Sequence, residues 1–285
     1  MHSQTERLAA RTLNCRGRLL DLSRPVVMGI LNVTPDSFFD GGRLDSIDLI
    51  LQRAGQMLKD GAALLDIGGA SSRPGAQAVS ADAEKQRVLP AIEAILKRFP
   101  DTLLSIDTWN AAVAKAALES GAAIVNDISG GRFDPGIMTV AAAYGSPYVL
   151  MHMQGNPATM QEQPVYDEVV REVLDFFIET VPHLQDAGIA DIVLDPGFGF
   201  GKTVEHNYRL LKHLSTFSSV LNRPVLAGLS RKSMICKVLH VNPDQALNGT
   251  TALHMVALQQ GAAILRAHDV REAMEVIKLW EQLEQ

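Results

Sequence analysis

The sequence VVMGILNVT at residues 26–34 is a short apolar run that ends in polar residues, and runs of this kind return along the whole chain. Each run is rich in Val, Ile and Leu, and a longer segment with helical spacing of apolar residues follows it. The runs are VVMGILNVT (26–34), ALLDIGG (63–69), LLSIDT (103–108), AIVNDISG (123–130), YVLMHM (148–153), DIVLDPG (191–197), PVLAGLS (224–230) and AILRAH (263–268). The sequence therefore predicts eight strands separated by helices.

The nearly continuous apolar character of these strands is typical of a parallel sheet that is covered on both faces. Helical faces between the strands fit this arrangement, with apolar residues at Ile47, Ile50, Leu51, Ala54 and Leu58 and again at Val88, Ile92, Ile95 and Leu96. The tripeptide GAA at 61–63, 121–123 and 261–263 indicates glycine-capped helix ends that lead into strands. Eight such units favour an α/β fold of the (β/α)8 TIM barrel type, with a doubly wound open sheet as the alternative.

Residues 12–22, TLNCRGRLLDL, predict a short N-terminal β-hairpin with its turn at Arg16-Gly17, placed under the N-terminal mouth of the barrel. No linker or low-complexity tract divides the sequence, so we expect residues 1–285 to form a single domain.

The composition excludes several classes of protein. The chain has 285 residues, 47% of them hydrophobic and 20% charged, which is typical of an ordinary globular protein. The net charge of −6 argues against binding to nucleic acid or to an anionic membrane by bulk charge. No stretch is long and apolar enough to span a membrane, and the N-terminal residues are too charged for a signal peptide. Two widely separated cysteines give no disulfide framework, so we expect a cytoplasmic protein.

Polar residues gather at the ends of the predicted strands. In a barrel of this type, catalytic groups come from the carboxyl ends of the strands, so these residues are the site candidates. They are Asn32, Asp66, Ser72, Arg73, Asp107, Asn126, Asp127, His152, Asp195, Ser230, Arg231, Lys232, Arg266 and His268. Each Asp or Asn alone is as readily explained as a helix cap. Together, Asp and Asn suit the amidine-like edge of a flat heterocycle, and Arg, Lys and His suit an anion.

Two features of the sequence resemble functional motifs without meeting their requirements. The segment GFGFGKT at 197–203 lacks the first glycine of a phosphate-binding P-loop, because Pro196 occupies that position. Its glycines also fail the spacing of a dinucleotide-binding fold. His152 stands alone between Met151 and Met153, which favours a hydrogen-bonded core histidine over a metal ligand.

Eight segments in order resemble the dihydropteroate synthase family over nearly the whole chain. They are ILNVTPDSFFDGG (30–42), DIGGASSRPGA (66–76), SIDT (105–108), NDISGG (126–131), LMHMQGNPATMQ (150–161), LDPGFGFGK (194–202), LSRKSMI (229–235) and RAHDV (266–270). The resemblance implies that 4-aminobenzoate displaces pyrophosphate from 6-hydroxymethyl-7,8-dihydropterin diphosphate, giving 7,8-dihydropteroate in folate synthesis. It also implies sulfonamides as competing ligands and a homodimer.

The resemblance also implies roles for individual residues. The pterin would be bound by Asp107, Asn126, Asp195, Lys232, Met151, Phe200 and Gly228. The diphosphate would be bound by Asn32, Arg73, Arg266 and His268, and 4-aminobenzoate by Ser72, Pro74, Phe38, Phe200, Lys232 and Ser233. The catalytic residues would be Asp107, Lys232, Arg73 and Asp40, and Asn32 would coordinate a Mg²⁺ cofactor on the diphosphate. Loops around Phe38 and Asp40 and around Ser72, Arg73 and Pro74 would close over the site.

The resemblance has one departure and leaves two alternatives. The family usually reads GGESTRPG, whereas this chain reads GGASSRPG at 68–75, with Ala70 in place of a carboxylate and Ser72 in place of a threonine. Loss of the methyl group at Ser72 loosens packing against the aminobenzoate ring.

The alternatives are a non-catalytic pterin-binding barrel and a methyltetrahydrofolate methyltransferase. The four diphosphate residues argue against the first, and the SRKS and SRPG segments argue against the second.

Overall fold

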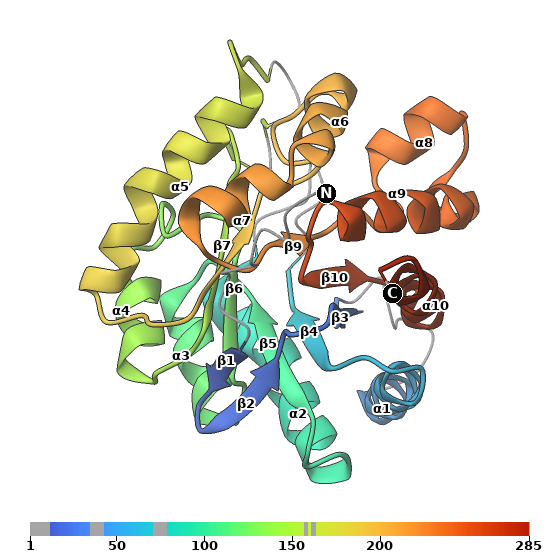
Figure 1. The fold of residues 1–285 in the computed structure, drawn as a ribbon. Helices are drawn as coiled ribbons and strands as arrows, with labels where there is room; N and C mark the ends of the chain where they lie inside the picture. Colours follow the sequence, from blue (N-terminus) through green and yellow to red (C-terminus); the bar gives the residue numbers. More distant parts are fainter. Residues whose placement is uncertain (1–11, 35–42, 71–78, 157–158, 161–163, 285) are drawn as a thin grey trace.

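The structure is a computed structural model that describes residues 12–34, 43–70, 79–156, 159–160 and 164–284, with the side chains of 43–46 left out. Helices surround an inner ring of strands (Figure 1). Among the described residues, no helix combines the length and the apolar character needed to cross a membrane.

Eight parallel strands form the inner ring. They are β3 (Val26–Asn32), β4 (Leu64–Gly68), β5 (Leu103–Asp107), β6 (Ile124–Asp127), β7 (Tyr148–Met151), β8 (Ile192–Asp195), β9 (Leu226–Ala227) and β10 (Ile264–Ala267). Their order in the sheet is β8-β7-β6-β5-β4-β3-β10-β9. A parallel bridge between Leu194 and Val225 then joins the two edges, and the Leu194 amide donates to the Pro224 carbonyl at 2.9 Å. The TIM barrel is therefore confirmed, and the open sheet is excluded.

The helices cover the outside of the ring (Figure 1). They are α1 (Arg43–Lys59), α2 (Ala81–Arg98), α3 (Ala111–Glu119), α4 (Gly136–Ala143), α5 (Val169–Asp186), α6 (Val204–Lys212), α7 (Ser215–Leu221), α8 (Ser233–Leu239), α9 (Leu247–Gln259) and α10 (Val270–Leu283). Helices α1, α2 and α10 pack directly on the strands of the ring, and the predicted faces of α1 and α2 pack in the core. Gly61, Gly121 and Gly261 have φ of +104°, +106° and +83°, which confirms the predicted glycine caps.

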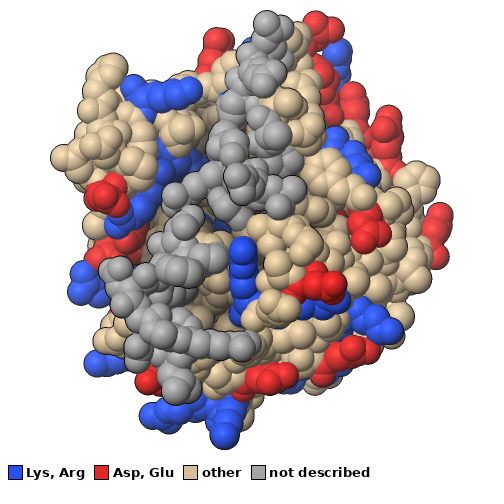
Figure 2. Space-filling view, turned by 180° about the vertical axis from the view of Figure 1, so that it is seen from behind, with Lys and Arg blue, Asp and Glu red and all other residues tan. Residues whose placement is uncertain are grey.

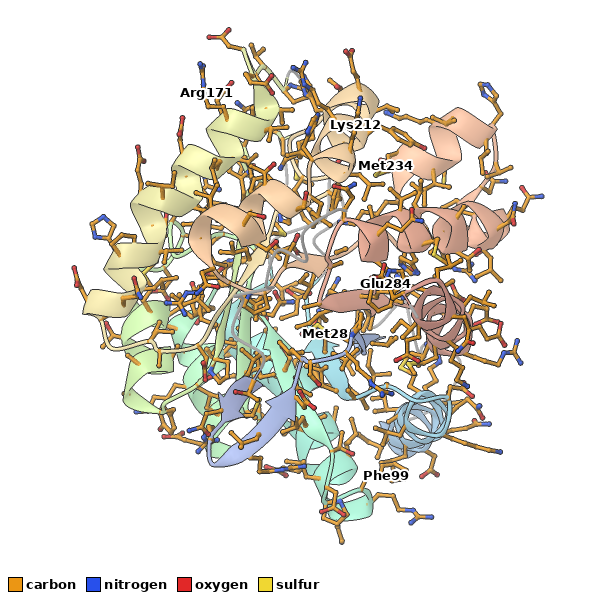
Figure 3. All side chains as sticks on the ribbon, in the orientation of Figure 1. Met28, Phe99, Arg171, Lys212, Met234 and Glu284 are labelled. Carbon is orange, nitrogen blue, oxygen red and sulfur yellow. The ribbon has the colours of Figure 1, made fainter. Side chains whose placement is uncertain are left out.

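Side chains of each strand alternate between the inside of the ring and the helical layer, because successive residues of a strand point to opposite faces. The inner apolar layer at the N-terminal side consists of Met28, Leu64, Leu103, Ile124, Val149, Val193, Leu226 and Ile264. The neighbours of these residues along the strands, such as Val27 and Leu65, belong to the layer that packs against the helices. Met28 lies inside the ring of strands and is completely buried (Figure 3).

The hairpin of β1 (Thr12–Cys15) and β2 (Arg18–Asp21) closes the N-terminal end of the ring. Its turn residues Arg16 and Gly17 both have positive φ, +58° and +90°, as tight hairpin turns of this kind require. Leu13, Cys15, Leu20 and Leu22 pack against the inner apolar layer. Arg16 Nη1 also donates to the carbonyls of Leu118 and Ala122 at 2.6 and 2.8 Å. The predicted hairpin and its position are both confirmed.

We expect the Leu13→Ala substitution to lower the free energy of unfolding by about 2 to 4 kcal/mol, because Leu13 is 1% exposed and a smaller side chain leaves a cavity between hairpin and barrel. The Leu19→Ala substitution in the same hairpin is the control, since Leu19 is 72% exposed and its loss costs about 0.5 kcal/mol or less. Denaturant unfolding measures both. Equal effects in the two variants would contradict the role of the hairpin as a plug.

Candidate active site

The candidate site lies at the carboxyl ends of the strands, opposite the hairpin. The same alternation that places the inner apolar layer turns one further residue of each strand into the mouth of the ring. These residues are Asn32, Gly68, Asp107, Asn126, Met151, Asp195, Gly228 and Arg266, with Asp66 one inward position deeper. On this side of the molecule, seen from behind the view of Figure 1, Lys and Arg side chains show near the centre (Figure 2).

A buried ionic cluster joins four of these residues. Arg266 Nε donates to Asp66 Oδ2 and Arg266 Nη2 donates to Asp107 Oδ2, each at 2.7 Å. Asn126 Nδ2 donates to the same Asp66 Oδ2 at 2.9 Å. Burial alone would lower the pKa of Arg266, but the carboxylates of Asp66 and Asp107 raise it above the ordinary value. The guanidinium therefore stays charged, shared between two carboxylates.

One cation cannot offset two desolvated carboxylates completely. Burial raises the pKa of Asp107 to about 7, Arg266 opposes the shift, and Asp66 adds to it. In the free protein, Asp107 therefore exchanges its proton near neutral pH. A ligand that brings hydrogen-bond donors to Asp107 favours the ionised form.

A second group of residues spans the gap between β8 and β9. Asp195 Oδ1 accepts a hydrogen bond from the Gly197 amide at 2.7 Å. A Cβ atom at Gly228 would lie 4.0 Å from Asp195 Oδ2 and 3.9 Å from Lys232 Nζ. Burial raises the pKa of Asp195, with Lys232 opposing, and burial lowers the pKa of Lys232 to about 8, with Asp195 opposing. The missing side chain at Gly228 leaves space beside both charges.

Lys232 also borders a small apolar surface. Its ammonium lies 4.5 Å from the centre of the Phe200 ring and donates to the Phe198 carbonyl. Phe200 packs beside an apolar cluster of Ile128, Met151, Met153 and Met160, together with Trp109. A flat ring with polar edges suits this combination of apolar floor and charged rim.

The loop at 197–201 is held from below by Lys202, which the sequence analysis gave no role. Lys202 Nζ lies 3.0 Å from His152 Nδ1 and donates to the carbonyls of Gly197 and Phe200, each at 3.0 Å. Burial lowers the pKa of His152 to about 2. His152 is thus the hydrogen-bonded core histidine that the sequence predicts. Lys202 and His152 together fix the loop that carries Phe200.

Asn32 and Asp107 face a shared space beside Gly68. A Cβ atom at Gly68 would lie 3.2 Å from Asn32 Oδ1 and 3.7 Å from Asp107 Oδ2. His268 and Ser233 lie at the rim, and both are exposed. Ser233 is the first residue of α8, and the His268 amide donates to Ser230 Oγ at 3.2 Å.

Two strand-end candidates have structural roles instead. Asp127 accepts from the amides of Ser129 and Gly131 at 2.7 and 2.6 Å and from the Tyr148 hydroxyl at 2.5 Å. Arg231 forms a two-pronged ion pair with Asp269, with both distances 2.8 Å. This ion pair, which we name the Arg231–Asp269 clamp, joins the loops that follow β9 and β10. Capping of the turn at 128–131 and bracing of two loops explain these two residues.

Five residues implied by the resemblance lie outside the described residues. They are Phe38, Asp40, Ser72, Arg73 and Pro74. Within the described ranges, no group of three or more His, Cys, Asp or Glu side chains is placed to hold a metal ion. The role of Asp66 was missed at the level of sequence, although its inward position, two residues before Gly68, follows from strand alternation.

The barrel and its charged mouth define a ligand-binding α/β enzyme, and comparisons with known proteins specify the class. Residues 28–268 match the family model described as pterin binding enzyme. The chain is 49% identical to the dihydropteroate synthase of Escherichia coli strain K12, over 94% of this chain and 95% of that protein.

Solved structures give the same result. The Yersinia pestis dihydropteroate synthase with a sulfonamide drug complex has a TM-score of 0.90 and 48% identity, covering 96% of this chain and 99% of that one. The Xanthomonas albilineans enzyme with 4-aminobenzoic acid has a TM-score of 0.90 and 42% identity, covering 97% and 99%. The same enzyme with 7,8-dihydropteroate has a TM-score of 0.86 and 40% identity, covering 96% and 98%. The chain belongs to the dihydropteroate synthase family.

The raised pKa of Asp107 predicts a pH dependence of stability. Near pH 4 the unfolded chain begins to lose the proton that folded Asp107 keeps until about pH 7, so this residue lowers the free energy of unfolding as pH rises across that range. We expect the Asp107→Asn substitution to reduce the decline, measured by denaturant unfolding at pH 4.5 and pH 7. Asp195 retains a decline of the same sign, because burial raises its pKa too. An undiminished decline in the variant would show that Asp107 ionises normally.

Proposed function

We infer that the chain catalyses the synthesis of 7,8-dihydropteroate, with 4-aminobenzoate displacing pyrophosphate from 6-hydroxymethyl-7,8-dihydropterin diphosphate in folate biosynthesis. The observation that carries this inference is the set of inward polar residues at one barrel mouth, Asp107, Asn126, Asp195 and Arg266, with Lys232 beside them. The decisive experiment is release of pyrophosphate from the dihydropterin diphosphate by the purified chain, with and without 4-aminobenzoate. Release that needs both substrates supports the function, and no release excludes it.

We propose that the pterin ring lies between the two groups of charges. Asp107, Asn126 and Asp195 would meet its polar edge, while Met151, Phe200 and Lys232 would cover its faces. Gly228 would leave room for the ring, since the nearest atoms to a Cβ atom there are Leu226 Cδ2, Lys232 Nζ and Asp195 Oδ2, all at 3.9 to 4.0 Å. Carboxylates accept the N–H groups of an amino-pyrimidine edge, which supports this placement.

We propose that the diphosphate is bound by Asn32, Arg73, Arg266 and His268. The contacts of Arg266 with Asp66 and Asp107 use Nε and Nη2, and a guanidinium has further N–H groups for an anion. For 4-aminobenzoate we propose Ser72, Pro74, Phe38, Phe200, Lys232 and Ser233. The positions of Phe200 and Lys232 against each other, with the hydroxyl of Ser233 one residue further along, support a site for an aromatic carboxylate.

We propose Mg²⁺ as the cofactor, with Asn32 as its protein ligand. The donor set fits, because Asn32 Oδ1 and Asp107 Oδ2 face the space beside Gly68, and Mg²⁺ prefers one or two protein oxygens together with substrate phosphates. When bound, the ion supplies charge neutralisation to the departing diphosphate.

The residues of the chain would do three things in this reaction. Arg73, Arg266 and His268 would take up the charge that develops on pyrophosphate as it leaves. Asp107 and Asp40 would lie near the positive charge on the dihydropterin methylene. Lys232 would align the aromatic amine, whose neutral nitrogen attacks without a strong base. The order of events, with departure of pyrophosphate before attack, is part of this proposal.

The competing hypothesis is a barrel that binds pterin without catalysis, and pyrophosphate release separates the two. We propose sulfonamides as competitive ligands of this chain, as the drug complex of the Yersinia enzyme suggests. Whether Ala70 and Ser72 weaken that binding is settled by an inhibition assay.

We further propose a single-domain, cytoplasmic homodimer. The two cysteines, Cys15 and Cys236, are both free thiols, as a reducing compartment favours. Apolar residues of α9 and α10 such as Leu258 and Ile277 pack on their own barrel and are therefore not available for a contact between subunits. Leu279 and Leu283, by contrast, are 62% and 68% exposed on one face of α10 and support a subunit contact.

We expect the Asp195→Asn substitution to weaken binding of 6-hydroxymethylpterin by at least about 2 kcal/mol, because an amide presents a donor to a ligand donor where the carboxylate accepts. Titration calorimetry measures the loss. Asp175→Asn on the outer surface of α5 is the control and should bind as the parent protein does. Parental affinity in the Asp195 variant would remove this residue from the pterin site.

Chelation of Mg²⁺ should abolish turnover while leaving the affinity for unphosphorylated 6-hydroxymethylpterin nearly unchanged, because the ion is proposed to contact only the diphosphate. Pyrophosphate release and calorimetry, each with excess chelator, measure the two effects. Full turnover in chelator would count against the metal. A large loss of pterin affinity would instead mean that the ion contacts the ring.

A further inference from the structure

We propose that Asp66 is a positioning residue that fixes the side-chain amide of Asn126, so that Asn126 presents its oxygen and not its amino group to the pterin. The inference rests on the proposed function and assigns a role that the pterin, diphosphate and aminobenzoate contacts above do not include.

The contacts of Asp66 are the starting point. Its side chain is completely buried, and its Oδ2 accepts from both Arg266 Nε at 2.7 Å and Asn126 Nδ2 at 2.9 Å. Its Oδ1 is buried with no hydrogen-bond partner among the described residues. A carboxylate in this position is costly unless its partners are fixed, because one unpaired buried oxygen already loses its contact with water.

The contact between Asp66 and Arg266 decides which group of Asn126 can face Asp66. The guanidinium of Arg266 is always charged, and it reaches Asp66 Oδ2 directly. Asp66 Oδ2 therefore acts as an acceptor, both from Arg266 Nε and from Asn126 Nδ2. Only the amino group of Asn126 can face it, since the amide oxygen would place two acceptors in contact.

The geometry of an amide then sets what the ligand meets. The oxygen and the nitrogen of Asn126 diverge from one carbon, so Nδ2 directed at Asp66 turns Oδ1 away from it. Asn126 occupies the inward position at the end of β6, beside Asp107 on β5. The side chain thus offers an acceptor to ligand N–H groups, and it cannot rotate to offer a donor without breaking its bond to Asp66. Such locking gives stronger discrimination than a free amide.

Asp66 also contacts a residue that is proposed to bind the diphosphate. Asp66 Oδ2 holds Arg266, which also contacts Asp107. Loss of Asp66 would therefore loosen an anion contact and an amide contact together. Exchange of the hydrogen-bonding groups within the pair, by contrast, should restore the contact between the two side chains, because the amide on β4 then donates to a carboxylate on β6.

Three variants test the inference: Asp66→Asn, Asn126→Asp and the two combined. In the first, the amide on β4 can present either its oxygen or its nitrogen, so Asn126 is no longer restricted to donating, and in the second, two carboxylates oppose each other. In the double variant, the amide nitrogen introduced on β4 takes the place of Asp66 Oδ2 and can donate to the carboxylate introduced on β6, while the contact of that position with Arg266 Nε is given up. The carboxylate on β6 still turns an oxygen to the ligand. The probe is 6-hydroxymethylpterin, titrated calorimetrically below the unfolding temperature of each variant.

We expect each single variant to lose about tenfold or more in affinity and the double variant to bind at least about fivefold more tightly than either single. If the loss of affinity in the double variant equals the product of the two single losses, the inference is overturned. Parental affinity in folded Asp66→Asn would overturn it too, because a purely structural role of Asp66 would affect unfolding and not binding.

The parent protein gives a second measurement if a single variant does not fold. The side-chain N–H signal of Asn126 in NMR should keep its chemical shift when 6-hydroxymethylpterin binds, because that group faces Asp66 in both states. A large shift would mean that the amino group meets the ligand. If the parent protein does not bind the probe at all, the proposed function fails, whereas binding with non-reciprocal variants refutes only the role of Asp66.

Discussion

Alternation of side chains within a closed ring of parallel strands is the constraint on which the site depends. Each strand is short, so only one or two inward positions follow its inward apolar residue before the chain reaches the mouth. The last of them emerges at the mouth, and the eight strands together supply eight such positions. Which polar side chains reach the mouth is therefore decided by which residues of a strand point inward. Asn126 faces inward, while its neighbour Asp127 caps a turn on the outside.

Charge compensation inside the mouth is incomplete. Arg266 contacts Asp66 and Asp107. The positive charges of Lys232 and Lys202 act on Asp195. Burial raises the pKa of Asp107 and Asp195 and lowers that of Lys232, so each group is displaced toward its neutral form. A substrate with N–H donors at one end and an anion at the other supplies what the free protein lacks. Binding of such a substrate would therefore relieve part of the cost of burying these charges.

Strands, helix faces, glycine caps and the hairpin were all predictable from the sequence, because each depends on residues close together along the chain. Contacts across the ring were not predictable from spacing. Arg266 and Asp66 are separated by 200 positions, and nothing local shows that they share a hydrogen bond. Lys202 was missed for a similar reason, since its partner His152 lies 50 residues away and both looked like parts of other motifs. Residue types predicted the chemistry of the mouth, but only the fold shows which side chains form hydrogen bonds with one another.

The ring has one weak join, between β8 and β9. The strand β9 has two residues, and a single bridge with one neighbouring hydrogen bond connects it to β8. The Arg231–Asp269 clamp braces the outer loops and not the join itself. Asp195 and Gly228 lie on the two sides of this join, so a pterin ring bound between them would add a further contact across it. Ligand occupancy and local opening of the barrel wall are then opposing equilibria, and the free protein should exchange backbone amide hydrogens fastest along the line where its ligand would rest.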